Sequence, residues 1–137
     1  MTVPMKKTSR RILVYAVAGF LVWRVSLCLG IIRAIPIEWV DYRNGYTRNS
    51  DFGIMPDGDV RCPLCLGHVA ALYGGIVEDY RRDGLRTRAG DPVWRWEGCV
   101  LDAFWECDRC GKKFNSDGKA ILRLPGMLKR LLHGEDH

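Results

Sequence analysis

Two Cys-x-x-Cys pairs constrain the fold of this chain more than any other feature of its sequence. The first pair is Cys62 and Cys65, and the second is Cys107 and Cys110. Two cysteines separated by two residues can present both thiolates on one tight turn, and two such turns supply the four sulfur ligands that Zn²⁺ prefers in a tetrahedral site. The sequence therefore predicts that the two pairs meet in space around one structural metal ion.

Charge is distributed unevenly along the 137 residues, which carry a formal net charge of +5. Six basic residues and no acidic residue precede Glu38, so the remainder of the chain has a net charge of −1. A body without a net positive field is not drawn to phosphate backbones. We therefore rank a nucleic-acid-binding role as the third hypothesis.

A long apolar segment follows the basic N-terminal flank, residues 1–11. Residues 12–32 contain one charged residue, Arg24, and as a helix would be about 31 Å long, which matches a hydrocarbon core of about 30 Å. The sequence predicts a single transmembrane helix over residues 12–33. Two alternatives stay open: a buried helix in an oligomer, and a cleaved signal peptide with a faintly lipoprotein-like sequence before Cys28.

Two signals disagree about which side of the membrane carries the C-terminal domain. The basic residues between Lys6 and Arg11 outnumber those after the span, which places the N-terminus in the cytoplasm. Reduced, metal-binding cysteines instead indicate a cytoplasmic C-terminal domain. The sequence leaves the topology open.

The rest of the chain divides into three parts. Residues 34–59 are rich in turn residues and are predicted to be a mostly irregular connector, residues 60–115 form the cysteine domain, and residues 116–137 form a tail with a short amphipathic helix near Leu124–His133. Apolar residues from Val69 to Tyr80 recur with helical spacing, so a helix is expected between the cysteine pairs, with a hairpin turned by Gly74-Gly75 as the alternative. Val93–Trp96 and Val100–Glu106 are predicted strands, with a turn at Glu97-Gly98.

The two cysteine motifs resemble the knuckles of the zinc-ribbon superfamily. The second motif continues as Gly111-Lys112-Lys113-Phe114, with a glycine for the turn and then an aromatic residue, whereas the first has Leu66 where a glycine is usual. The resemblance implies that each knuckle lies at the tip of a β-hairpin. The 41 residues between Cys65 and Cys107 exceed the spacing of about 15–20 that is common for paired knuckles. The fold class expected is small α+β: a transmembrane helix followed by a zinc-ribbon-like hairpin module with an inserted helix.

Other chemistry for the cysteines stays open. Iron in a rubredoxin-like centre needs the same four ligands, structural disulfides would form in an oxidising compartment, and Cys62-Pro-Leu-Cys65 resembles a redox motif in which Cys62 attacks and Cys65 resolves. His68 and Cys99 are spare ligands that we interpret as an exposed helix-start residue and a small strand residue.

The sequence contains no nucleophile, phosphate-binding or metalloprotease motif, so no catalytic residue and no small-molecule substrate is predicted. The leading hypothesis is a membrane-anchored, zinc-binding module for protein interaction or assembly, and a membrane-tethered thiol–disulfide oxidoreductase is the second. The residues expected to contact a protein partner are Trp94, Trp96, Arg81, Arg82, Arg86 and Arg88.

Overall fold

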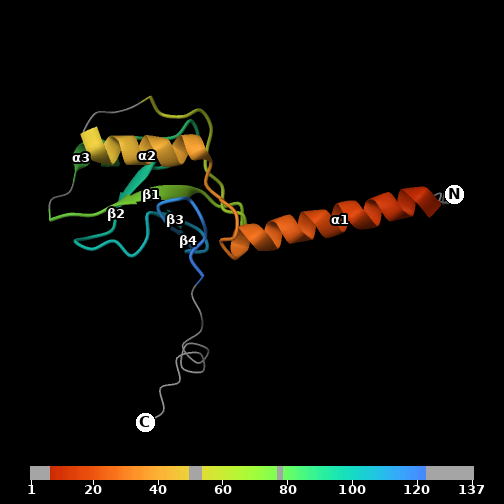
Figure 1. Cartoon of the computed structure of the whole chain (residues 1–137). Helices are drawn as coiled ribbons and strands as arrows, with labels where there is room; N and C mark the ends of the chain where they lie inside the picture. Colours follow the sequence, from red (N-terminus) through yellow and green to blue (C-terminus); the bar gives the residue numbers. More distant parts are fainter. Residues whose placement is uncertain (1–6, 50–53, 77–78, 123–137) are drawn as a thin grey trace, which may run out of the picture.

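The computed structural model describes residues 7–49, 54–76 and 79–122 of the chain. A long helix projects from a small α+β head, which we define as residues 33–122 (Figure 1). The elements in chain order are α1 (Lys7–Cys28), α2 (Ile37–Asn49), β1 (Val69–Tyr73), α3 (Tyr80–Asp83), β2 (Trp94–Trp96), β3 (Trp105–Cys107) and β4 (Lys113–Phe114). The helix predicted near Leu124–His133 lies outside the described residues.

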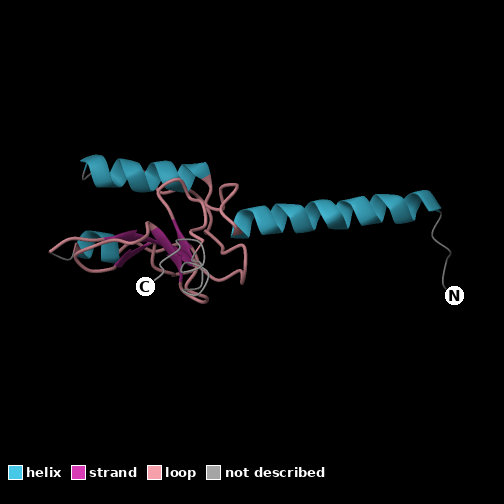
Figure 2. Ribbon diagram, turned by 60° about the horizontal axis from the view of Figure 1, so that its bottom comes forward, coloured by secondary structure: helices cyan, strands magenta, loops and turns pink. Residues whose placement is uncertain are grey.

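The head is built on a four-stranded sheet with the strand order β2-β1-β3-β4. β1 is the central strand: it pairs in parallel with β2, where Ala71 lies opposite Trp94, and antiparallel with β3, where Val69 lies opposite Cys107. β3 and β4 form an antiparallel hairpin. All five residues of β1 are buried. α2 covers one face of the sheet (Figure 2), and charged side chains of β2, β3 and β4 cover the other.

The predicted helix over Val69–Tyr80 is wrong, because its first half is β1. The apolar run VAALY is buried on both faces and has strand neighbours on both edges, so helical periodicity in this stretch is coincidental. The two glycines after it form no hairpin back along β1. Gly74 instead allows a close approach, since a Cβ there would lie 2.9 Å from the carbonyl oxygen of Gly98.

The strand prediction for Val93–Trp96 is confirmed by β2, whereas the one for Val100–Glu106 is correct only at its end, where β3 begins at Trp105. The prediction that a turn at Glu97-Gly98 joins the two strands directly is wrong. β1 lies between β2 and β3, so the connection through Glu97-Gly98 crosses the end of the sheet.

The prediction of an irregular connector over 34–59 is wrong where α2 forms. Trp39, Tyr42 and Tyr46 recur at spacings of three and four residues and are all buried, so one face of α2 packs on the sheet. The turn-like pair Asn44-Gly45 lies on the other face, where a Cβ added to Gly45 would meet no atom within 4 Å. The core therefore begins at Ile35, upstream of the first cysteine pair.

A buried arginine joins α2 to the sheet. Arg43 is 3% exposed, and its guanidinium donates to the carbonyl oxygens of Leu72 at 2.9 Å and Phe104 at 3.2 Å. Its charge also lies over the Phe104 ring, 4.2 Å from the centroid. Burial, and to a lesser extent the neighbouring Arg82, lower the pKa of Arg43 to about 10, so it remains charged at neutral pH.

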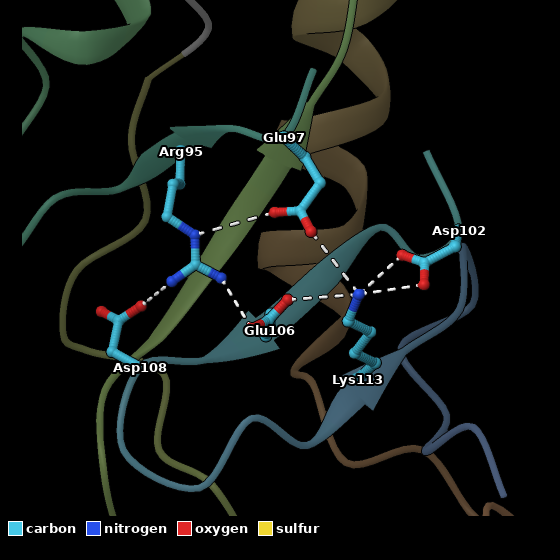
Figure 3. Close-up of polar contacts among 6 residues, drawn as sticks. All are labelled: Arg95, Glu97, Asp102, Glu106, Asp108 and Lys113. Carbon is cyan, nitrogen blue, oxygen red and sulfur yellow. Dashed lines mark hydrogen bonds and ion pairs between the residues drawn. The ribbon is translucent and has the colours of Figure 1, made fainter. Parts of the chain in front are cut away.

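An ion-pair network covers the face of the sheet opposite α2 (Figure 3). Arg95 of β2 lies 3.2 Å from a carboxylate oxygen of Glu106 in β3, and Lys113 of β4 lies 3.5 Å from its other oxygen. The remaining acidic members are Glu97, Asp102 and Asp108. Ala70 and Leu72 point to this face and are fully buried, so the network takes the place of a second covering helix.

α1 has 22 residues and is long and apolar enough to cross a membrane, with most of its surface exposed. As a straight helix it is about 33 Å long. The chain that follows α1 joins the head directly. The amides of Ala34 and Ile35 both donate to the carbonyl oxygen of Gly118, at 2.8 and 3.0 Å, and the backbone of Arg33 forms an antiparallel bridge with that of Lys119.

We predict that Arg43→Met destabilises the head by roughly 3 kcal/mol, because two buried carbonyl oxygens lose a charged donor. Denaturant unfolding of the full chain in detergent, followed by tryptophan fluorescence, measures the change. Arg86→Met is the matched control, since Arg86 is exposed, and we expect a change within about 0.5 kcal/mol. Equal losses in the two variants would contradict the role given to Arg43.

Candidate metal centre

The first cysteine pair lies on a tight turn between Arg61 and His68, which form an antiparallel bridge. Within this turn, which we name knuckle 1 (residues 61–68), the amide of Cys62 donates to the carbonyl oxygen of Gly67 at 2.9 Å. The amide of Leu66 donates back to the carbonyl oxygen of Cys62 at 3.0 Å. These two bonds hold both thiols on the same side of the turn.

The second pair repeats this arrangement at the tip of the β3–β4 hairpin. In knuckle 2 (residues 106–113) the amide of Cys107 donates to the carbonyl oxygen of Lys112 at 2.9 Å, and the amide of Gly111 donates to that of Cys107 at 3.0 Å. The placement of each motif on a hairpin turn agrees with the sequence prediction. The two knuckles are equivalent residue for residue, despite different sequences between and after the cysteines.

The four thiols converge, as the sequence predicts. Their sulfur atoms all lie within 4.8 Å of one another. Two close contacts connect different knuckles: Cys62 Sγ lies 3.6 Å from Cys110 Sγ, and Cys65 Sγ lies 3.4 Å from Cys107 Sγ. A tetrahedron of sulfurs at about 2.3 Å from a zinc ion has edges of about 3.8 Å, whereas a disulfide needs about 2.05 Å. The cysteines are free thiols at metal-site spacing, and they could hold one metal ion.

Backbone amides around the thiols favour the thiolate form that a metal needs. The amide of Leu64 donates to Cys62 Sγ and that of Gly67 to Cys65 Sγ, each at 3.4 Å. The bond from Gly67 is the main reason that the pKa of Cys65 falls to about 7. Burial raises the pKa values of Cys62, Cys107 and Cys110. This donor set fits a metal ion, whose positive charge would offset the cost of three partly or fully desolvated thiolates.

The residues after the second cysteine of each knuckle adopt the left-handed conformation. Gly111 has φ of 71°, and its counterpart Leu66 has φ of 58°. Among the described residues Leu66 is the one non-glycine with positive φ, a conformation that costs roughly 1–2 kcal/mol for a residue with a Cβ. The departure from the usual glycine noted in the sequence is therefore accommodated by backbone strain.

Gly67 is required by close packing between the knuckles. A Cβ on Gly67 would lie 2.6 Å from the Cβ of Arg109 and 3.1 and 3.2 Å from the sulfurs of Cys107 and Cys65. Glycine at this position lets the two knuckles approach closely enough for their thiols to meet. The sequence contained the signal, a glycine two residues after the second cysteine, but not the reason for it.

The two spare ligands lie away from the thiol cluster. His68 is buried rather than exposed at a helix start: its Nε2 donates to the carbonyl oxygen of Pro92 at 2.7 Å, and its Nδ1 lies 2.8 Å from Asp59. With Asp59 and Asp91 it forms a second group close enough for a metal, but both ring nitrogens are already engaged, so we assign it a structural role. Cys99 is exposed in the loop after β2 rather than in a strand.

The redox hypothesis required Cys62 to be an accessible, attacking thiolate. Cys62 is instead fully buried, with a raised pKa, and the thiol with the lowered pKa is Cys65. Each thiol also lies within 3.6 Å of a sulfur atom of the other knuckle. The geometry favours metal ligation over thiol–disulfide exchange with Cys62 as the attacking thiolate.

The predicted contact residues separate into core and surface. Trp94 is 1% exposed and packs against Tyr42, Tyr46 and Tyr73, so its side chain is not available to a partner. Arg82 lies over the Tyr46 ring, 4.6 Å from its centroid. The remaining four, Trp96, Arg81, Arg86 and Arg88, are exposed.

A groove of about 950 Å³ that sequence reasoning missed runs along α2. Trp39, Tyr42 and Tyr46 contribute to its lining, together with the 54–59 segment, and its rim carries Glu38 and Asp41. Sequence reasoning missed the groove because it did not predict α2. Only a helix places these aromatic residues on one face.

Comparisons of the chain with protein-family models, with curated proteins and with solved structures find no match. The description of the site therefore depends on its geometry.

We predict that Gly67→Ala lowers metal affinity by at least an order of magnitude, because the new methyl group must displace Arg109 or two ligand sulfurs. Competition with a chromophoric chelator measures the affinity. Gly45→Ala is the matched control: its site on α2 is open, and alanine favours a helix by about 1 kcal/mol, so metal affinity should not change. Unchanged affinity in Gly67→Ala would contradict the proposed packing.

Metal affinity should fall steeply as the pH falls, because protons compete with the metal for the thiolates. At pH 7 Cys65 is about half ionised and the other three thiols are protonated, so each metal displaces between three and four protons. We expect the apparent affinity to drop by roughly three to four orders of magnitude from pH 7 to pH 6. A chelator titration at several pH values tests this, and a flat profile would rule out ligation by all four thiols.

Proposed function

We propose that this chain is a membrane-anchored zinc-binding module that serves protein interaction or assembly without catalysis. One observation carries the proposal: two equivalent knuckles, each at a hairpin turn, direct four thiols to one point. The proposal includes a zinc-ribbon-like identity for the knuckle pair. β1 and β3, which follow and precede the two knuckles, pair with each other in one sheet.

Zinc is the proposed metal because a four-thiolate, tetrahedral shell is typical of structural zinc sites. Iron in a rubredoxin-like centre would use the same cysteines, so metal content distinguishes the two. A shell closed by four protein ligands has no open position for water or substrate. This closure supports a structural role for the metal and a binding role for the head.

The proposed anchor is α1. Its apolar residues face outward along its length, and Leu27 is its buried residue. An exposed apolar surface of this size needs a covering environment, and the length of the helix matches a bilayer. The head then stays at the membrane surface, held close to the helix where Gly30, just after α1, packs against the backbone of Ala120.

For the partner contact we propose the exposed members of the predicted set, Trp96, Arg81, Arg86 and Arg88. Trp96 ends β2, an edge strand of the sheet, and α3 with Arg81 packs beside it. An aromatic side chain flanked by arginines is typical of the residues that contribute most at protein interfaces. Trp94 and Arg82 are not part of this surface, because Trp94 is buried and Arg82 packs on the Tyr46 ring.

Metal analysis of the full chain, purified in detergent without added metal, tests the proposal. We expect one zinc per chain and no disulfide by free-thiol counting. Cys107→Ser should lose the metal and the cooperative unfolding of the head, because the remaining ligands leave the shell open. Cys99→Ser is the matched control and should keep both. Iron in place of zinc, or interconverting Cys62–Cys65 oxidation states without metal, would overturn the zinc-module proposal, and release of the chain from membranes by alkaline carbonate would overturn the anchor.

A further inference from the structure

The root of α1 lies at the same end of the head as the two knuckles. Gly30, just after α1, packs against the backbone of Ala120, and Ala120 pairs with Phe114 at the end of β4. The next two residues, Ile121 and Leu122, share a hollow with Leu64 of knuckle 1 and Lys112 of knuckle 2. In both views α1 leaves the head at the end where β1 begins, directly after knuckle 1 (Figures 1 and 2).

Large apolar side chains are exposed at this end, which we name the knuckle end. Leu64 and Leu66 project from knuckle 1 with 47% and 64% of their surface exposed, and Leu122 is 53% exposed beside them. At the root of α1, Leu29 and Ile31 are also exposed. These residues continue the apolar surface of α1 onto the head.

Leu66 indicates that this apolar surface has a function. Its left-handed backbone would be unstrained with glycine, as in knuckle 2, and its exposed side chain adds nothing to the core. Within the described fold, no apolar burial of the Leu66 side chain compensates for the strain of its backbone. Burial of this side chain outside the head, against lipid, would offset the strain.

The charge at the knuckle end suits an anionic surface. Arg33 and Arg109 are exposed there, and Lys112 is half-buried in the hollow with Leu64. The acidic neighbours are paired: Asp108 lies 2.5 Å from Arg95, and Asp59 contacts His68 and Arg61. Exposed cations beside exposed leucines are typical of surfaces that bind anionic lipid headgroups and insert apolar side chains between them.

We propose that the knuckle end is a lipid-binding surface: Leu64, Leu66 and Leu122 enter the interface of an anionic bilayer next to α1. Arg109 and Lys112 face the lipid phosphates, and the metal centre lies at the membrane surface. This inference depends on the proposed anchoring by α1, because the helix is what brings the knuckle end to the bilayer. It adds a defined orientation of the head relative to the bilayer, which anchoring by α1 alone does not determine.

Fluorescence quenching by brominated lipids tests the orientation. The full chain is reconstituted in vesicles of equal parts phosphatidylcholine and phosphatidylglycerol with brominated acyl chains. It carries an environment-sensitive fluorescent amino acid at Leu64, at Val17 in α1, or at Ile76. Ile76 is the matched control, being an exposed apolar residue that follows β1 at the opposite end of the head. Metal content confirms that each variant is folded.

We expect strong quenching at Val17, several-fold stronger quenching at Leu64 than at Ile76, and a fall at Leu64 in pure phosphatidylcholine. Quenching at Val17 with equally weak quenching at Leu64 and Ile76 would overturn the orientation and keep the anchor. Weak quenching at all three positions would overturn both. A reporter at Leu64 shielded from brominated lipid and from aqueous iodide alike would indicate a protein or a second copy on this surface, and would also overturn the proposal.

Leu66→Asn separates apolar insertion from folding, because asparagine tolerates the left-handed conformation. We expect this variant to keep its metal and to lose at least half of the quenching at Leu64. Lys112→Gln combined with Arg109→Gln should remove the dependence on phosphatidylglycerol. Unchanged quenching in both variants would show that these side chains do not contact lipid.

Discussion

The pairing of β1 with β3 is the contact on which the head depends. Val69, four residues after Cys65, lies opposite Cys107 itself, so the register of this one ladder sets the distance between the two knuckles. A slip by one residue would turn the fully buried β1 over and separate the thiols. The long insert between the cysteine pairs is therefore no obstacle to a shared site. It supplies the central strand and β2, and returns the chain along the opposite edge of β1.

The four-thiol cluster and the apolar core belong to the same small head, and the core alone is of limited size. The core centres on Trp94, with α2 above the sheet and Arg43 bonded to the carbonyl oxygens of Leu72 and Phe104. A domain of this size buries a limited apolar area, and a metal that binds only the folded arrangement adds its binding free energy to folding. This coupling explains why substitutions at Gly67 and at Arg43, in different layers of the head, are both expected to have large effects.

Features determined by a few neighbouring residues were predictable from the sequence, whereas features that depend on tertiary packing were not. The knuckles are short turns whose geometry is encoded within six residues, so their positions and the meeting of their thiols could be inferred. β1 and α2 could not: VAALY suits a buried strand or a buried helix equally, and only neighbours on both edges decide. The aromatic face of α2 was hidden by Asn44-Gly45, which reads as a turn but lies on the solvent side. Trp94 was assigned to the surface because burial depends on that same unrecognised helix.

The junction between α1 and the head has a mechanical consequence. Residues 29–32 connect α1 to the head, and within them Gly30 packs closely against the backbone of Ala120. The amides of Ala34 and Ile35 then donate to Gly118, so the chain is held by the head within a few residues of the end of α1. A junction this short and closely packed would pass rotation or tilt of α1 on to the head. A partner that binds α1 would then also reorient the groove beside α2 and the edge of β2.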